Sequence, residues 1–217
     1  MQTPKVIFLD AVGTLFGVRN SVGEVYGEIA DQFGVEVSVK EVNRAFYNSF
    51  KQSNKMAFPG VEPQEIPTKE YEWWKAIAIQ TFQTVGVFDR FSDFDSFFEE
   101  LYAYFATEKP WFVYPDVYPT LEYWQKLGIE MGVLSNFDSR LYPVLKKLNL
   151  AEFFTSITIS TEVGAAKPDR QIFHAALQKH NCLPESAWHI GDSYKEDYQG
   201  AKAAGLKAIW LKRNQNL

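Results

Sequence analysis

Hydrophobic and polar positions divide this chain into two kinds of pattern. A continuous apolar run at residues 6–9 predicts a short strand that is buried on both faces of a parallel sheet. From about residue 17 to residue 110, apolar positions recur at helical spacing, and no convincing strand is present. After residue 110, strand-like and helix-like segments alternate. The simplest interpretation is an α/β core with a helical insert.

The helical stretch contains three apolar stripes that are rich in aromatic residues. They consist of Phe94, Phe97, Phe98, Leu101, Tyr102 and Phe105; of Tyr71, Trp74, Ala78 and Phe82; and of Val42, Phe46 and Phe50. Such stripes at helical spacing indicate packed helices rather than a cofactor site. Ser92 and Asp95 resemble a capping box before the first stripe, and residues 58–67, with three prolines, predict a loop.

The alternating segments after residue 110 predict the core. We expect strands at 130–135, 156–160, 187–191 and 207–211, and helices at 115–128, 139–148, 169–180 and 195–204. This order favours right-handed crossovers and a doubly wound, Rossmann-like parallel sheet with helices on both faces. Residues 1–16 and 111–217 would form this α/β core domain, and residues 17–110 an inserted helical cap.

Composition narrows the functional classes. The 217 residues are 46% hydrophobic and 23% charged, which suits one substantial core and a smaller appended domain. Apolar runs are too short to span a bilayer, and the N-terminus enters a strand without a secretory segment. The lone Cys182 fits a reducing cytoplasm, and a net charge of −5 gives no footprint for nucleic acid. We expect a cytoplasmic protein with a small-molecule substrate and neither a membrane nor a nucleic-acid partner; its oligomeric state stays open.

The segment FLDAVGTLF, residues 8–16, places Asp10 directly after the first predicted strand. Open α/β sheets bind ligands at the carboxyl ends of their strands. Gly13 lets the backbone approach a ligand closely, and the Thr14 hydroxyl can bind an anion. Taken alone, the segment also fits a strand-end cap followed by an ordinary turn.

Further polar residues follow the other predicted strands. Ser135 and Asn136 follow the strand at 130–135, Lys167 is held near the sheet rim by the proline after it, and Asp192 and Asp197 follow the strand at 187–191. Individually they could be loop formers, a surface cation and a helix-terminal charge. Because each of these polar residues follows a predicted strand, their side chains should meet at one edge of the sheet, which favours a single shared ligand site.

The chemistry of these residue types points to phosphoryl transfer. Asp10 and Asp192 would repel each other unless a cation separates them, and oxygen ligands favour a hard ion such as Mg²⁺. The candidate donors for a tetrahedral oxyanion are Thr14, Ser135, Asn136 and Lys167. A carboxylate nucleophile, a metal ion and a lysine together favour a reaction through an aspartyl-phosphate.

These segments resemble the haloacid dehalogenase superfamily over essentially the whole chain. FLDAVGTLF, VLSNFD, GAAKPDRQIF and HIGDSYKED are similar to its four motifs in order. The position of the insert resembles the helical cap of the first subfamily. More narrowly, RNSVGEVYGEIA, YEWWKAIAIQTF and VLSNFDSRL resemble the group named haloacid dehalogenase-like hydrolase domain-containing 3, which is related to rhythmically expressed gene 2 proteins.

The resemblance implies a magnesium-dependent phosphatase that acts on small phosphorylated metabolites. It implies these roles: nucleophile and metal ligand for Asp10, metal ligand for the Val12 carbonyl and for Asp192, metal support for Asp197, and phosphoryl binding for Ser135 and Lys167. Superfamily phosphatases carry at position 12 an aspartate that protonates the leaving oxygen and then activates water. Such acid–base help is worth roughly 10²–10⁴ in rate. Val12 cannot supply it, so we expect slow or leaving-group-selective catalysis.

Three other interpretations stay open. The string DAVGTLF resembles 2-haloacid dehalogenases, which use no metal, and Arg44 is either a carboxylate-binding residue of that kind or a solvated helix charge. The fourth motif of these dehalogenases is uncharged, so the charged Asp192 disfavours the dehalogenase interpretation. Phosphonate cleavage would need a cap lysine, for which Lys51 and Lys55 are candidates by position. The chain could also be a non-catalytic protein that binds Mg²⁺ and phosphate.

Overall fold

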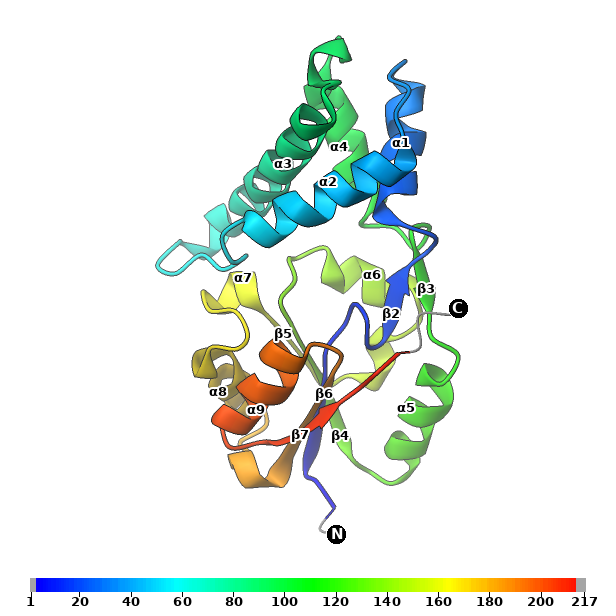
Figure 1. The fold of residues 1–217 in the computed structure, drawn as a ribbon. Coiled ribbons are helices and arrows are strands. Elements are labelled where there is room, and N and C mark those ends of the chain that lie inside the picture. The colour runs from blue at the N-terminus through cyan, green and yellow to red at the C-terminus, as the bar shows by residue number, and fades with distance from the viewer. Residues whose placement is uncertain (1–2, 214–217) are drawn as a thin grey trace.

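The computed structural model describes residues 3–213 in two layers, a sheet-containing core and a group of helices stacked on one end of it (Figure 1). Residues 1–2 and 214–217, at the outer ends of the predicted core segments, lie outside the described residues. Within the described part, we find no helix with the length and apolar character needed to cross a membrane.

Five parallel strands form the core sheet. They are β1 (Val6–Leu9), β4 (Glu130–Ser135), β5 (Ser156–Ile159), β6 (Ala187–Gly191) and β7 (Lys207–Trp210), in the spatial order β5-β4-β1-β6-β7. The first strand is therefore central, and Leu9 at its end pairs with Val133 on one side and Ile190 on the other. This arrangement confirms the predicted doubly wound α/β fold and brings the ends of β1, β4 and β6 together.

Helices cover both faces of this sheet (Figure 1). Ile7 and Leu9 pack in one core cluster with residues of α5 (Val117–Lys126) and α6 (Leu141–Lys147). Val6 and Phe8 pack in another with α8 (Arg170–Lys179) and α9 (Gly200–Ala203). Since alternate side chains of a strand point to opposite faces, burial of both faces explains why β1 is apolar throughout.

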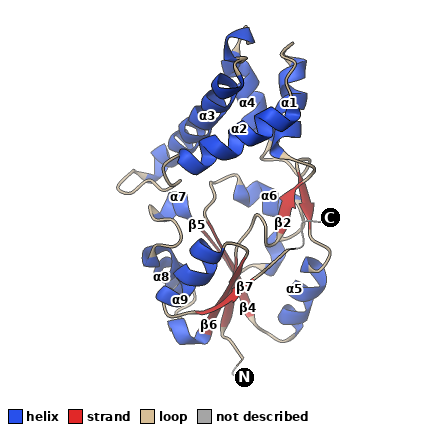
Figure 2. Ribbon diagram, viewed as in Figure 1, coloured by secondary structure: helices blue, strands red, loops and turns tan. Residues whose placement is uncertain are grey.

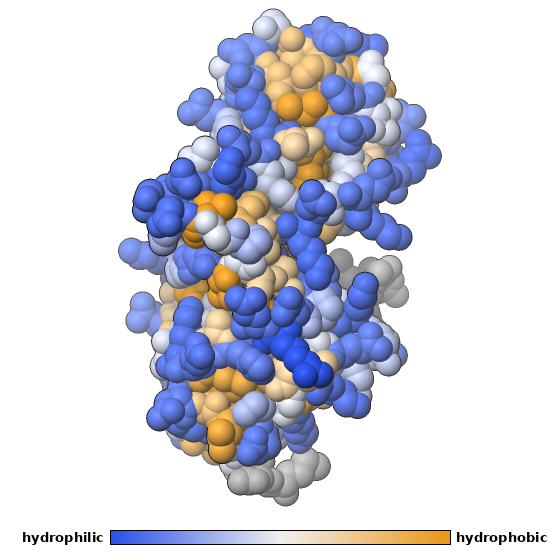
Figure 3. All heavy atoms as spheres, turned by 90° about the vertical axis from the view of Figure 1, so that its left-hand side faces the viewer, coloured by the Kyte–Doolittle hydropathy of each residue, from blue (hydrophilic) through white to orange (hydrophobic). Residues whose placement is uncertain are grey.

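The helical insert consists of α1 (Val22–Gln32), α2 (Val39–Gln52), α3 (Ile66–Val85) and α4 (Phe94–Tyr104). These helices form the upper layer of Figure 2, and no strand interrupts residues 22–104. Their aromatic stripes meet in a separate core in which Phe82, Phe97 and Phe98 are almost fully buried. Most positions of the stripes are therefore packing surfaces, as predicted, while Phe50 is 44% exposed. On the face shown in Figure 3, hydrophilic residues cover much of the surface, while apolar residues reach it both within the insert and over the core below.

The structure differs from the sequence-based expectation at the junction of core and insert. Two three-residue strands, β2 (Phe16–Val18) and β3 (Trp111–Val113), form an antiparallel ribbon where the chain leaves and re-enters the core. The expectation of no strand from residue 17 to 110 is therefore wrong at its first residues. A three-residue strand is too short to show a periodic pattern, and this pair is defined by a partner nearly a hundred residues away.

Helix ends also differ from the expectation. The predicted loop at 58–67 ends early, because α3 starts at Ile66 with a proline in its first turn, where the missing N–H is not needed. Helix α4 is capped by Asp93, which accepts a hydrogen bond from the Ser96 amide at 3.0 Å, rather than by Ser92 and Asp95. The helix predicted at 195–204 is a π-helical turn, η5 (Tyr194–Gln199), followed by the short α9.

Buried hydrogen bonds join the helical insert to the core. Glu70 on α3 is fully buried and accepts hydrogen bonds from the Ser139 amide at 3.0 Å, the Ser139 hydroxyl and the Thr161 hydroxyl at 2.6 Å. Burial raises the pKa of Glu70. The Trp74 indole, also on α3, donates to Asp138 at 2.6 Å. These contacts link α3 to the loop after β4 and to α7 (Ser160–Val163).

We predict that Glu70→Ala lowers the free energy of unfolding by about 2 kcal/mol or more, because each buried donor left unsatisfied costs about 1–3 kcal/mol. Urea unfolding measures this change. The matched control is Glu72→Ala on the same helix, where an exposed pair with Lys69 contributes little to stability because solvent screens it. Equal effects of the two substitutions would contradict a buried link through Glu70.

Candidate active site

The ammonium group of Lys167 lies between two carboxylates. Its Nζ atom is 2.7 Å from Asp10 Oδ1 and 2.6 Å from Asp197 Oδ1, and it donates to the Leu134 carbonyl at 3.1 Å. The lysine is 1% exposed. It comes from the segment between α7 and α8, Asp10 follows β1, and Asp197 belongs to η5. Three distant parts of the chain therefore meet at one buried charge.

The two carboxylates are not equally compensated. Although burial disfavours a charged amine, Asp10 and Asp197 raise the pKa of Lys167, so it stays an ammonium ion. Burial also opposes the charge of Asp197, but Lys167 and a hydrogen bond from His189 hold the pKa of Asp197 below its usual range. For Asp10, burial prevails over Lys167, and the pKa is raised. Asp197 is therefore ionised and fully compensated by its neighbours. The ionised form of Asp10 is not fully compensated, so a further cation would stabilise it.

Asp197 is held on both oxygens. Its Oδ1 contacts Lys167 and His189 Nε2, the latter at 2.8 Å, and its Oδ2 accepts from the Ser193 amide at 2.9 Å. A Cβ at Gly191 would overlap the Asp197 carboxylate, so the glycine leaves room for it. Burial lowers the pKa of His189 and favours its neutral ring. His189 was not predicted as a site residue, although a histidine within a buried strand three residues before Asp192 was a usable signal.

Asp192 is the exposed member of an acidic group. Carboxylate oxygens of Asp10, Asp192 and Asp197 lie within 4.8 Å of one another. Partial burial and the charges of Asp10 and Asp197 raise the pKa of Asp192 to about 6. Gly13 has φ +87°, and a Cβ there would lie 2.5 Å from Asp192 Oδ2. The loop after β1 can therefore reach Asp192 only with glycine at this position.

A divalent cation fits this group. When ionised, three carboxylates and one ammonium group leave two negative charges uncompensated, and all the candidate ligand atoms are oxygens. Hard divalent cations bind through such ligands. Both oxygens of Asp197 are already engaged by donors. Asp10 and Asp192 are therefore the side chains that would hold the ion, with Asp197 in support. A contribution from the Val12 carbonyl stays a prediction.

The predicted phosphate-binding residues lie at different members of this group, around Asp10, Lys167 and Asp192. Ser135 ends β4 and is 3% exposed, and its side chain acts on the Asp10 carboxyl in the direction that lowers the pKa of Asp10. Asn136 accepts from the Lys167 amide at 2.7 Å and donates to the Lys167 carbonyl at 3.1 Å. This side chain therefore positions the lysine backbone. The Thr14 hydroxyl is 3.4 Å from Asp192 Oδ1.

Glu196 is a further acidic residue near the site that the sequence analysis did not single out. Its Oε2 accepts from Asn136 Nδ2 at 3.3 Å, and burial raises its pKa. The predicted cap residues lie elsewhere: Arg44 and Lys51 are exposed on α2, and Lys55 is exposed in the loop after it. Lys55 is the nearest of these, since its charge acts on Glu196.

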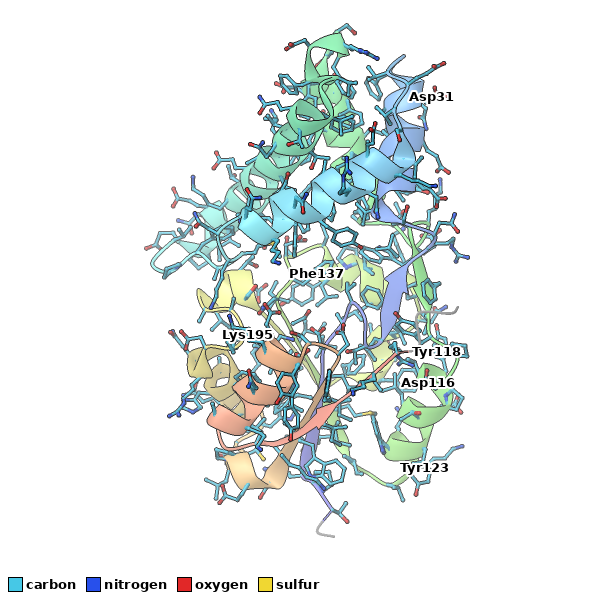
Figure 4. The ribbon with its side chains drawn as sticks, viewed as in Figure 1. Asp31, Asp116, Tyr118, Tyr123, Phe137 and Lys195 are labelled. Carbon is cyan, nitrogen blue, oxygen red and sulfur yellow. The ribbon has the colours of Figure 1, made fainter. Side chains whose placement is uncertain are left out.

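A cavity of about 240 Å³ lies between the insert and the core, and it is lined in part by Val12 and Asn136. Val12 therefore contributes an isopropyl group beside the site, two residues from Asp10. Phe137, labelled in Figure 4, lies between the core and α2 and also lines the cavity. Aliphatic and aromatic side chains from α1 to α4 provide most of the remaining wall.

The fold and this group of strand-end residues define a hydrolase of the haloacid dehalogenase type, and residues 4–205 match the family described as haloacid dehalogenase-like hydrolase. The chain belongs to this family. It is 34% identical over 205 residues to haloacid dehalogenase-like hydrolase domain-containing protein 3 of Bos taurus, covering 94% of this chain and 80% of that protein. It is 30% identical to the rhythmically expressed gene 2 protein of Drosophila melanogaster, covering 93% and 80%. The narrower resemblance is thereby confirmed.

Solved structures share the fold. One described as a HAD phosphatase from Thermococcus onnurineus aligns with a TM-score of 0.64 at 24% identity, over 98% of this chain and 88% of that one. Other structures with this fold are described as dehalogenases. At such identities the likeness shows the fold, and the reaction has to be argued from the residues of this chain.

We predict that Lys167→Met lowers the free energy of unfolding at pH 7 by about 3–5 kcal/mol, because loss of one partner leaves buried charges uncompensated. The loss should be smaller at pH 5 than at pH 7, because the pKa of Asp10 is raised by burial and a larger share of this carboxyl is protonated at the lower pH. Urea unfolding in EDTA at the two pH values measures both effects. Lys126→Met, at an exposed position of α5, is the control. A change no larger than that of the control would contradict the central role of Lys167.

We predict a metal-dependent stability difference for Asp192→Asn. Since the pKa of Asp192 is raised, its protonated form favours folding, and this contribution is complete below about pH 4 and is lost as the pH rises through about 6. At pH 7 in EDTA the variant should therefore melt at a higher temperature than the unmodified protein, and the difference should vanish toward pH 4.

Added Mg²⁺ should reverse this order, because binding to the folded state raises the melting temperature of the unmodified protein. The variant should gain little. A variant that is less stable than the unmodified protein in EDTA at pH 7 would show that Asp192 is satisfied without a cation.

Proposed function

We propose that this protein is a magnesium-dependent phosphatase that acts on small phosphorylated metabolites through an aspartyl-phosphate at Asp10. The observation that carries the proposal is the uneven compensation of the acidic group. Lys167 and the donors around Asp197 fix one carboxylate, while Asp10 and Asp192 retain charge that a divalent cation can balance. Family membership supports hydrolysis as the class of reaction.

In the first step, an oxygen of Asp10 attacks phosphorus, the bond from phosphorus to the leaving oxygen breaks, and that oxygen departs with the electron pair. Lys167 and Ser135 lie beside Asp10 and would donate hydrogen bonds to the phosphoryl oxygens. Thr14 would contribute from the loop after β1. The cation, when bound, supplies charge neutralisation for the phosphoryl group. Hydrolysis of the acyl phosphate then releases phosphate and restores the Asp10 carboxylate.

Val12 limits both steps. It can neither donate a proton to the leaving oxygen nor accept one from the attacking water. The first step should therefore favour substrates whose leaving group is stable as an anion, and the second step should be the slower one. This limit is also what favours the main alternative, a non-catalytic protein that binds Mg²⁺ and phosphate.

The dehalogenase alternative is weaker. Asp192 adds negative charge beside Asp10, which disfavours an anionic 2-haloacid without a metal ion. Arg44, the candidate for binding the carboxylate of such a substrate, is exposed on α2 and does not line the cavity. Nor do Lys51 and Lys55 line it, so neither supports phosphonate cleavage.

In the proposed function, the core domain and the helical cap have different roles. Residues 1–16 and 111–217 would form the catalytic core and residues 17–110 the cap that selects the substrate, with the β2–β3 ribbon as their junction. The lone Cys182 supports a reducing, cytoplasmic location. The overall negative charge supports a small-molecule substrate rather than nucleic acid.

We predict that the phospho-enzyme accumulates when the protein is mixed with acetyl phosphate and Mg²⁺, because attack by Asp10 is assisted while hydrolysis of the intermediate is not. Intact-mass measurement should show one added phosphoryl group. Val12→Asp supplies a base, so it should shorten the lifetime of the adduct and raise turnover, by up to roughly 10²-fold.

Asp10→Asn is the matched control, since it keeps the shape of the side chain but removes the nucleophile, and it should form no adduct. Absence of an adduct on the unmodified protein, together with no gain in turnover from Val12→Asp, would favour the non-catalytic alternative.

A further inference from the structure

We infer that the cavity beside Val12 takes the apolar, ring-sized body of the leaving group, so that the substrate is an acyl or aryl phosphate with a hydrophobic body. This inference rests on the proposed function and adds the chemical class of the substrate. Three observations support it: the apolar lining of the cavity, the ion pair that occupies Arg140, and the presence of Val12 at the position where phosphatases of this family carry an acid.

The lining is almost entirely apolar. Among the described residues that form the wall, Asn136 carries the only side-chain amide and Arg140 the only charge. The others are aliphatic or aromatic, among them Val12, Phe50 and Phe137, and three of them, Tyr26, Tyr47 and Tyr102, add one hydroxyl each. A sugar or a second phosphate would lose its hydration here with few hydrogen bonds in exchange.

Arg140 is already neutralised. Its guanidinium donates to both oxygens of Asp138, through Nε at 2.9 Å and Nη2 at 2.7 Å, and also to the Tyr102 carbonyl at 3.3 Å. Its other surface lies over the Tyr102 ring, 3.9 Å from the centroid. Asp138 also receives the Trp74 indole. The arginine is therefore a part of the packed wall, and it offers no free cation to a carboxylate or phosphate on the leaving group.

The volume of the cavity and the aromatic residues at its surface fit a ligand with a single ring. An apolar cavity of about 150 Å³ holds a benzene molecule, so about 240 Å³ accommodates a ring with a short linker. Phe50 and Tyr47 on α2 line the same cavity and are 44% and 54% exposed. Phe50 stacks with Phe46 and Trp74 at centroid distances of 5.9 Å. An apolar ligand would cover part of this aromatic surface.

Val12 connects the cavity to the chemistry. The same side chain removes the expected acid and extends the apolar wall. An acyl phosphate needs no acid, because its carboxylate leaves with the electron pair of the broken phosphorus–oxygen bond and stays unprotonated near neutral pH. An aryl phosphate releases a phenolate, which is a poorer leaving group but far better than a sugar alkoxide. The chemistry and the shape of the site thus select the same substrates.

Benzoyl phosphate and acetyl phosphate test the inference, because their leaving groups are similar in acidity and differ by the ring. With Mg²⁺, kcat/KM for benzoyl phosphate should be roughly ten- to a hundredfold higher, mainly through a lower KM. Phe50→Ala should reduce this ratio. Tyr123→Ala, at an exposed position on α5 labelled in Figure 4, should leave it unchanged.

A binding measurement keeps the inference separate from turnover. Phenylphosphonate should bind the Mg²⁺-loaded protein at least tenfold more tightly than methylphosphonate by calorimetry. Equal affinity for the two phosphonates, or equal KM for the two acyl phosphates, would overturn the apolar pocket and leave the phosphatase proposal intact. Faster cleavage of glucose 6-phosphate than of benzoyl phosphate would overturn it too. Absence of any turnover, with phenylphosphonate still preferred, would overturn the phosphatase proposal and support the pocket.

Discussion

One buried ammonium group shared by two carboxylates organises this protein. Lys167 can remain charged at 1% exposure only because Asp10 and Asp197 lie within 2.7 Å of its Nζ atom. These contacts join Asp10, at the end of β1, to Lys167, which lies 157 residues later in the chain. They also join Lys167 to Asp197 in η5, a further 30 residues along. The central place of β1 in the sheet makes the meeting possible, since the strand ends on both sides adjoin Asp10.

The same interaction sets the chemical character of the site. Because Asp197 is satisfied by Lys167, His189 and the Ser193 amide, it serves as a fixed anchor. Asp10 and Asp192 share the remaining negative charge, and in the proposed function Asp10 would be both the nucleophile and a ligand for a cation. The helical insert adds an apolar wall above this charged site, and buried contacts of Glu70 and Trp74 hold that wall against the core.

The sequence was sufficient to predict the fold class, and it named candidate residues that the structure brings together at one edge of the sheet. Asp10, Ser135, Lys167 and Asp192 could be located because the carboxyl ends of parallel strands converge, so position along the chain implies position in space. The aromatic stripes were interpreted as packing, and most of their positions are buried, because helical periodicity of apolar residues reports a buried face. Phe46, Phe50 and Trp74 of these stripes also line the cavity, which the periodicity did not indicate.

Other features depend on pairings that no local pattern records. The clamp of Asn136 on the Lys167 backbone, the buried Glu70 and the neutralised Arg140 each need a partner from another part of the chain. The β2–β3 ribbon is similarly short and non-local. The start of α4 was also not predicted correctly, although only neighbouring residues are involved. Several polar residues there can cap the helix, and the backbone conformation determines that Asp93 is the one that does.

The central claim is that Asp10 accepts the phosphoryl group while Lys167 and Ser135 hold it. A crystal structure with Mg²⁺ and beryllium fluoride, a mimic of the aspartyl-phosphate, tests this claim most directly. Our account predicts a beryllium fluoride group attached to the Asp10 carboxylate, with Lys167 and Ser135 donating to its fluorine atoms and the metal ion between Asp10 and Asp192. A structure in which Mg²⁺ is bound but Asp10 carries no adduct and keeps its contact with Lys167 would contradict it.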